Sequence, residues 1–167
     1  AMTIQQRAIV DARDCIKPSA RMCFYAQKQA KIDSTHPIQP SPTSVGECLK
    51  RYYLHGNASC YALLARYGKE YVMRYPLEDF HGSTGSLISS GSEAADRYTK
   101  LRLNELGDRM FNSLDKDTID IWFDNFSNTD KFPSVLPSLG FYNIVNGTTG
   151  IATGISSSIP EFNIREV

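Results

Sequence analysis

Residues 99–103 alternate between two kinds of side chain. The odd positions are Thr or Leu, and the even positions are Lys100 and Arg102. A two-residue period is typical of a β-strand with one buried face, so this stretch is predicted to be a strand. The same alternation places Tyr98 on the outward face, next to the two cations.

Tyr98 is the candidate nucleophile of this stretch. A tyrosine hydroxyl has a pKa of about 10, and nearby positive charge favours the phenolate that attacks. The same cations would attract a phosphate and stabilise the charge that develops during its transfer. The pattern therefore fits a tyrosine that attacks a phosphodiester. It also fits ordinary surface residues on an exposed strand.

Helices are predicted before this strand. Residues 4–14 contain helix formers with imperfect periodicity, and Pro18 then interrupts the chain. A second helix is predicted from Ser19 to Ala30, with Arg21 on its polar face. A loop with three prolines follows, and Ser44-Val-Gly-Glu47 has the spacing of a capping box, which would start a short helix reaching about Tyr53.

The next segment suggests a helix-turn-helix. His55-Gly56-Asn57 is predicted to be a turn, with Asn57 as the N-cap of a helix over 58–67. Two short helices joined by a tight turn that contains glycine form the outline of this motif. The second helix carries few groups that read base edges, so a DNA contact here would depend on shape and phosphates. A helical hairpin buried in a core fits the same periodicity.

Shorter elements are predicted in the remainder. Residues 79–92 are dense in Gly and Ser and form either a loop that approaches a phosphate or a solvent-exposed linker. An apolar stripe from Leu103 to Leu114 predicts a helix, and 125–131 read as a polar turn. Strands are predicted at 118–123, 134–136, 142–145 and 150–155.

Composition and charge narrow the function classes. The 167 residues are 41% hydrophobic and 22% charged, which is ordinary for a globular domain. Without an apolar run of about 18 residues or a signal peptide, a cytoplasmic location is expected. The formal net charge is zero, but the charges are unevenly distributed. The chain up to Tyr75 contains 11 Lys and Arg and 5 Asp and Glu, whereas acidic residues outnumber basic ones afterwards. This asymmetry fits a first half that faces a phosphate backbone, and it also fits chance.

The four cysteines do not form a recognisable metal motif. They are spread without a CxxC pair, and the three histidines add no closely spaced ligands. The expectation is reduced, mostly buried thiols and no metal site in this chain.

Taken in order, these pieces resemble the breakage-reunion domain of type IIA DNA topoisomerases, the A subunit of bacterial DNA gyrase and its topoisomerase IV counterpart. The resemblance covers essentially the whole chain. Its motifs are Arg7 to Pro18, Val45-Gly46, His55-Gly56, Arg74 to Leu77, Ala94 to Thr99, Lys116 to Thr118, Val135 to Pro137, Val145 to Gly154 and Ile159-Pro160. It implies an α/β (α+β) fold, with a winged-helix cleavage region over 1–123 and the beginning of a tower domain over 124–167.

The resemblance also implies roles for individual residues. Tyr98 would attack a DNA phosphodiester and become linked to the 5′ phosphate, and Arg97 would stabilise that phosphate. Arg7 and His55 match residues that the family places near the cleavage site. The positions that match DNA contacts are Lys17, Arg21, Arg51 and Ile159, where the isoleucine would insert between base pairs.

Cofactors and partners follow from the same resemblance. Mg²⁺ and ATP would be bound by a partner subunit with Toprim and ATPase domains, so this chain should not cleave DNA alone. The expected assembly on double-stranded DNA is two A and two B subunits, with no membrane contact. Gyrase and topoisomerase IV are not distinguished, because the C-terminal region that separates them is not part of this sequence.

Several positions depart from the family pattern. The serine and the acidic residue that anchor the quinolone water–metal bridge align with Ala58 and Ala62, so quinolone resistance is expected. The family's motif before the second helix has lost one histidine, its proline and its acid, since Asn57 stands at the acidic position. A DNA-binding or partner-binding module that keeps the fold without catalysis is therefore the alternative interpretation.

Overall fold

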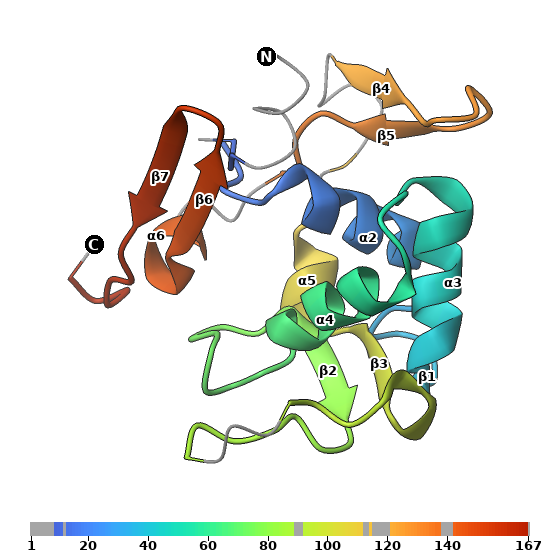
Figure 1. The fold of residues 1–167 in the computed structure, drawn as a ribbon, viewed down its shortest axis with the longest axis horizontal. Helices are drawn as coiled ribbons and strands as arrows, with labels where there is room; N and C mark the ends of the chain where they lie inside the picture. The colour runs from blue at the N-terminus through green and yellow to red at the C-terminus, as the bar shows by residue number, and fades with distance from the viewer. Residues whose placement is uncertain are drawn as a thin grey trace.

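The computed structural model describes residues 9–11, 13–88, 92–111, 114, 121–137 and 142–166. The architecture is α+β, as expected: helices α2, α3 and α4 pack on a three-stranded sheet, and two further hairpins follow (Figure 1). Within these ranges no helix is long and apolar enough to cross a membrane. The helices are α2 (Pro18–Gln29), α3 (Ser41–Arg51), α4 (Asn57–Tyr67), α5 (Glu105–Arg109) and α6 (Tyr142–Asn146), with a 3-10 turn η1 (Asp96–Tyr98).

The helix predicted after Pro18 is confirmed as α2. Proline fits the first turn because the N–H that it lacks would have no partner there. The buried positions recur at helical spacing, and they include Cys23, Phe24 and Gln27. The prediction that Arg21 stays on the polar face is wrong, because its side chain is 3% exposed. Of the helix predicted over 4–14, residues 9–11, 13 and 14 are not helical, and the rest lies outside the described residues.

Helices α3 and α4 form the predicted helical pair, but their N-termini differ from the prediction. α3 begins at Ser41, with Pro42 in its first turn, so Ser44 lies inside the helix and no capping box forms. α4 begins at Asn57 itself, and Gly56 is the N-cap, with φ of +87°. Glycine adopts this left-handed conformation without steric cost, whereas a larger side chain would be strained.

The sheet has the order β1-β3-β2 and is antiparallel throughout. Its strands are β1 (Gln39–Pro40), β2 (Glu78–His81) and β3 (Lys100–Leu103), so β2 takes the first residues of the predicted 79–92 loop. The predicted alternation in β3 is confirmed: Leu101 and Leu103 are fully buried against the helices, and Lys100 is exposed. Tyr98 precedes the strand and belongs to η1.

The remaining described elements differ from the predictions in their bounds or their type, and the strand predicted over 150–155 is divided between β6 and β7. α5 has five residues, and Leu103, with which the predicted helix begins, belongs to β3. Residues 142–145 were predicted to be a strand but form α6, and 134–136 follow β5 instead of forming a strand. The described strands are β4 (Trp122–Asp124), β5 (Lys131–Pro133), β6 (Thr148–Ala152) and β7 (Ile155–Ile159). They pair as the hairpins β4–β5 and β6–β7.

Both hairpins lie beside the unit formed by α2, α3, α4 and the three-stranded sheet (Figure 1). The ring of Phe132 on β5 packs on Tyr52, which follows α3, with ring centroids 5.6 Å apart. The side-chain amide of Asn125 donates to the carbonyl of Arg51 at 2.9 Å. The domain boundary predicted after residue 123 falls inside β4.

A buried carboxyl group lies between α2 and β2. Glu78 is 2% exposed; its Oε2 accepts a hydrogen bond from the Gln27 amide at 3.2 Å, and its Oε1 has no partner among the described residues. Burial raises the pKa of Glu78 well above its ordinary value, and the negative charges of Asp79, Cys60 and Asp108 act in the same direction. The carboxyl group is therefore held in its neutral form.

This raised pKa predicts a pH dependence of folding stability. The folded state holds the Glu78 proton at pH values where the unfolded chain has released it, so stability should be greatest below the ordinary glutamate pKa of about 4.3 and should fall as pH rises above it. Glu78→Gln keeps the shape and the Gln27 contact without a titrating proton, and we expect a flatter profile of urea midpoint against pH. The control is Glu105→Gln, because Glu105 is exposed on α5. Parallel profiles for wild type and Glu78→Gln would contradict the prediction.

Candidate functional site

Tyr98 is presented to solvent at the entry to β3. It is the last residue of η1, and the residue is 71% exposed. The guanidinium carbon of Arg97 lies 4.6 Å from the centroid of the Tyr98 ring, a cation–π contact. The phenol thus has a cation at its face, but the cation is Arg97 and not the two that the strand pattern indicated.

Thr99 fixes the backbone next to this tyrosine. It is 2% exposed, and its Oγ1 lies 2.7 Å from the Ser41 hydroxyl and 3.0 Å from the Tyr61 hydroxyl. Its carbonyl accepts from the Ser41 N–H at 3.0 Å. Helices α3 and α4 therefore both hold the turn that carries Tyr98. No sequence pattern indicated this, because the partners are 58 and 38 residues away.

The end of β2 lies against the same turn. Gly82 has a φ of +131°, and a Cβ at this position would come within 2.7 Å of the Thr99 methyl group. His81 is the cross-strand partner of Lys100, and both side chains are exposed. Directly opposite residues of an antiparallel pair point to the same face, so the His81 ring lies beside Lys100, which adds positive charge near the Tyr98 turn.

Arg102 does not contribute free charge to that face. Its Nε donates to Asp79 Oδ2 at 2.9 Å, and Asp79 is its cross-strand partner. Its guanidinium also donates to the carbonyls of Ser34 and His36. The charge of Arg102 is thus used to fasten the 34–36 loop to the sheet.

His55 precedes α4 and is exposed. Its ring packs edge-on against the Tyr53 ring, with centroids 5.3 Å apart, and its carbonyl accepts from the Ser59 hydroxyl at 2.6 Å. His55 lines a largely apolar cavity of about 710 Å³ between residues 9–11 and 13, α2 and the hairpin β4–β5. His55 is therefore placed at the N-terminus of the predicted second helix of the helix-turn-helix.

A basic pair lies where α2 and α4 approach each other. Lys17 is the N-cap residue of α2, and Arg66 is exposed in the last turn of α4. Burial lowers the pKa of Lys17, and the nearby charge of Arg66 lowers it further. An anion near both side chains would stabilise their charges. Sequence analysis identified Lys17 but did not identify Arg66, which only the packing of the two helices brings near.

Two other predicted DNA contacts have partners inside the protein. Arg21 donates from Nε to Asp14 Oδ2 at 2.7 Å and from Nη2 to Asp14 Oδ1 at 2.9 Å, and both side chains are buried. Arg51 donates to Glu47 at 3.2 Å and lies 3.8 Å from Asp130. Neither arginine offers an unpaired charge to a ligand in this structure.

The other predicted positions lie on separate elements. Ile159 is half-buried at the end of β7, opposite Thr148. Ala58 and Ala62 are exposed on α4, four residues apart and thus on one helix face. Arg7 lies outside the described residues. Of the predicted catalytic residues, Arg97 is the one that the described contacts bring onto Tyr98.

The fold and the site define an α+β protein in which a helical pair and a sheet edge present an exposed arginine–tyrosine pair. Comparison with known proteins identifies the family independently. The model of the family that comprises the A subunit of DNA gyrase and topoisomerase IV matches residues 7–167. The chain belongs to this family.

Named relatives give the same result. The chain is 38% identical over 164 residues to the DNA gyrase A subunit of Metamycoplasma arthritidis, an alignment that covers 98% of this chain and 18% of that protein. It is 39% identical over 160 residues to the DNA gyrase A subunit of Thermotoga maritima, with 96% of this chain and 20% of that protein covered. The chain spans about a fifth of the length of these relatives.

Proposed function

We propose that this chain is the DNA cleavage and religation region of a type IIA topoisomerase A subunit, and that Tyr98 is its nucleophile. The observation that carries the proposal is the exposed Tyr98 with the Arg97 guanidinium on its ring, held by buried Thr99. Family membership supplies the reaction class, and the geometry supports the residue.

The chemistry assigned to Tyr98 is a reversible transesterification. The Tyr98 oxygen attacks the phosphorus of a DNA phosphodiester, the bond to the 3′ oxygen breaks, and the phenolic proton leaves while the 3′ oxygen takes one up. The product is a 5′-phosphotyrosyl link and a free 3′ hydroxyl, so the reverse reaction reseals the strand. Arg97 offers N–H donors and a full positive charge for the phosphate oxygens at which negative charge develops.

A DNA path along α2 and α4 is the second part of the proposal. Lys17 and Arg66 are the cations that would neutralise backbone phosphates, and His55 precedes α4, the helix that carries Arg66. Ile159 at the end of β7 is assigned the role of the wedge between base pairs. The DNA contacts of Arg21 and Arg51 stay predictions, because each arginine would have to exchange its present acidic partner for a phosphate. The place of Arg7 near the cleavage site also stays a prediction, since Arg7 lies outside the described residues.

The metal and the nucleotide are assigned to a partner subunit. The candidate metal ligands that cluster within the described part of this chain are three thiols, whereas Mg²⁺ prefers carboxylate oxygens and water. These residues do not fit Mg²⁺, so we derive no step through it. We propose that a Toprim and ATPase subunit binds Mg²⁺ and ATP, and that two copies of each protein act on double-stranded DNA.

The winged-helix and tower assignments belong to the same proposal. α3 and α4 would be the helix-turn-helix of a winged-helix region, and the chain from residue 124 onward would begin the tower. The position of residue 124 inside β4 favours a boundary a few residues away from it.

The proposed function is tested by trapping DNA. The chain, or the longer protein of which it is a part, is mixed with its partner subunit, Mg²⁺, ATP and labelled DNA, and the reaction is stopped with denaturant. We expect label bound covalently to this chain through a 5′ phosphate, and none without the partner. DNA that binds reversibly but is never captured would contradict an active cleavage site.

That outcome would support the second candidate, a DNA-binding module of the same fold without catalysis. The observation that favours it is the internal pairing of Arg21 and Arg51, which leaves fewer cations for DNA. Fewer phosphate contacts predict weaker binding and a shallower salt dependence.

Ala58 and Ala62 predict a weak response to quinolones. A methyl group cannot hold a metal-bound water, so we expect no accumulation of cleavage complexes at drug concentrations that trap a sensitive topoisomerase. Restoring polar groups with Ala58→Ser and Ala62→Glu should raise drug-stimulated cleavage at least about tenfold, which corresponds to ~1.4 kcal/mol. Both positions are exposed, so the fold should tolerate the change. Strong cleavage by the wild type with drug would refute the prediction.

A further inference from the structure

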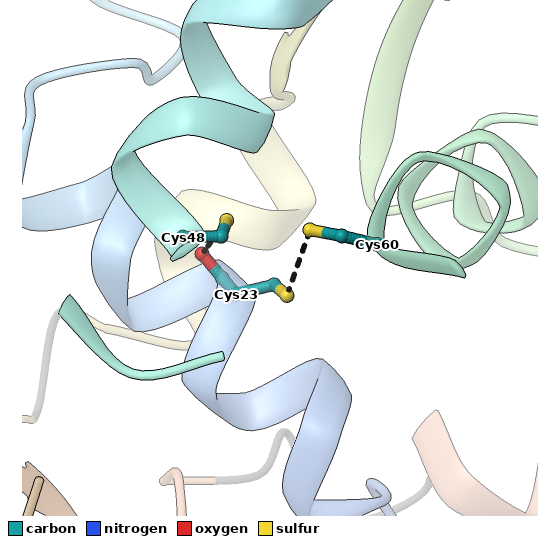
Figure 2. A group of neighbouring side chains, drawn as sticks. All are labelled: Cys23, Cys48 and Cys60. Carbon is teal, nitrogen blue, oxygen red and sulfur yellow. Dashed lines mark hydrogen bonds between the residues drawn. The ribbon is translucent and has the colours of Figure 1, made fainter. Parts of the chain in front are cut away.

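Three cysteines from three helices meet in the core, separate from the proposed cleavage site. Cys23 on α2, Cys48 on α3 and Cys60 on α4 are fully buried. Their three sulfur atoms lie within 4.8 Å of one another, and those of Cys23 and Cys60 are 3.6 Å apart. Figure 2 shows the three sulfurs converging from the separate helices.

The spacing of these sulfurs matches that of a three-coordinate metal site. A metal–sulfur bond of about 2.3 Å places three sulfurs about 4.0 Å apart when they surround the metal in a plane. The Cys23 and Cys60 sulfurs are 3.6 Å apart and all three sulfurs lie within 4.8 Å of one another, which is compatible with this value. A disulfide would require two of the sulfurs to approach to about 2.0 Å, which these positions do not provide.

The local electrostatics favour a thiolate at one corner of the cluster. Cys60 lies in the first turn of α4, where the positive end of the helix dipole stabilises negative charge. The Cys23 and Cys60 sulfurs share a hydrogen bond at 3.6 Å, and the Cys48 thiol donates to the Cys23 carbonyl. A cation in the centre would displace the thiol protons.

We propose that Cys23, Cys48 and Cys60 bind one Cu(I) ion as a three-thiolate site. Soft sulfur ligands select soft ions, chiefly Cu(I) and Zn(II). A structural zinc site requires a fourth ligand, and in the described part of the chain no further His, Cys, Asp or Glu joins this group. Three ligands without a fourth fit Cu(I). Each thiol that binds gives its proton to solvent, and no electron is transferred.

Binding would cross-link the helices that hold the Tyr98 turn. α3 and α4 carry Ser41 and Tyr61, the hydrogen-bond partners of Thr99. An ion bound only by the folded chain stabilises that chain by mass action. Because the thiols have no exposed surface, the ion would enter during folding or local opening.

The test uses the full chain refolded under anaerobic conditions with Cu(I). We expect one ion per chain retained against a competing chelator, three sulfur ligands at about 2.3 Å by X-ray absorption, and a Tm raised by about 5 °C or more. Cys48→Ala should lose the third sulfur and most of the Tm shift. Cys15→Ala is the matched control, because Cys15 lies outside the cluster, and it should bind as the wild type does.

Several results would overturn the proposal. The wild type could lose its copper to the chelator or show two or fewer sulfur ligands. Alternatively, Cys48→Ala could bind Cu(I) as tightly as the wild type does. A parallel titration with Zn(II) tests the choice of ion, and tighter binding of zinc than of copper would also refute the Cu(I) assignment. Circular dichroism checks that Cys48→Ala folds; if it does not, Cys23→Ala and Cys48→Ser serve in its place, with the same expected losses.

Discussion

Tyr98→Phe is expected to reduce covalent DNA capture to background, a loss of about a thousandfold or more, with the partner subunit, Mg²⁺ and ATP present. Phenylalanine keeps the ring under the Arg97 guanidinium but lacks the oxygen that would form the phosphotyrosyl bond. Because the residue is 71% exposed, the loss of its hydroxyl removes no buried hydrogen bond. Folding and reversible DNA binding should therefore remain close to those of the wild type.

The same assay on Tyr25→Phe provides the control. Tyr25 lies on α2 and packs against the rings of Tyr52 and Trp122, so this change removes one hydroxyl without touching the Tyr98 turn. Capture should be retained. If Tyr98→Phe captures DNA as well as Tyr25→Phe does, Tyr98 is not the nucleophile.

Arg97→Gln adds a distinction within this experiment. It removes the charge on the phosphate side of the reaction but leaves the Tyr98 hydroxyl, so capture should be slowed and not abolished. A variant that captures DNA at the wild-type rate would show that the cation–π contact serves only to hold the ring.

Arg21→Met is expected to destabilise the folded chain by about 3–5 kcal/mol. Methionine fills much of the space of arginine but leaves the Asp14 carboxylate buried without its cation. Asp14 still accepts from the N–H groups of Ile16 and Leu136, at 3.0 and 2.9 Å, which do not neutralise its charge. A loss of this size is a large part of the ~5–15 kcal/mol that stabilises a typical domain. Urea unfolding without DNA measures it.

A neighbouring ion pair provides the control for that prediction. Arg13 and Asp11 are also joined at 2.9 Å, but their side chains are 60% and 30% exposed. Arg13→Met should cost only about 0–1 kcal/mol, because water already screens an exposed pair. The double variant Asp14→Asn with Arg21→Met should recover part of the stability, since no buried charge is left. Equal losses for Arg21→Met and Arg13→Met would contradict a structural role for the buried pair.

The prediction for Arg21 rests on a difference between two basic residues that the sequence treats alike. Arg21 and Lys17 both follow the pattern of basic residues that the family places near DNA, yet Arg21 is buried on Asp14 and Lys17 lies near Arg66. The difference depends on Asp14, seven residues earlier in the chain, and on Leu136, 122 residues after Asp14. No local pattern reports such a partner.

The sequence by itself determined the helices α2, α3 and α4, the alternation in β3 and the family. These rest on local rules: apolar spacing, proline at a helix start, and motifs in a fixed order. It also indicated Tyr98 as the candidate nucleophile, because the tyrosine belongs to such a motif. The strand predicted over 142–145 was wrong because β-branched residues in a short segment do not outweigh the contacts that Tyr142 and Asn146 make with Tyr75.

Only the tertiary structure decided how the cations and thiols are used. It paired Arg102 with Asp79 and placed Arg97 on the Tyr98 ring. It also gathered three cysteines whose separation along the chain had argued against a metal site. Charge pairing and sulfur convergence depend on distances in space between helices, and these distances are set by packing. The sequence pattern therefore locates the candidate tyrosine, while the packing decides which side chains surround it.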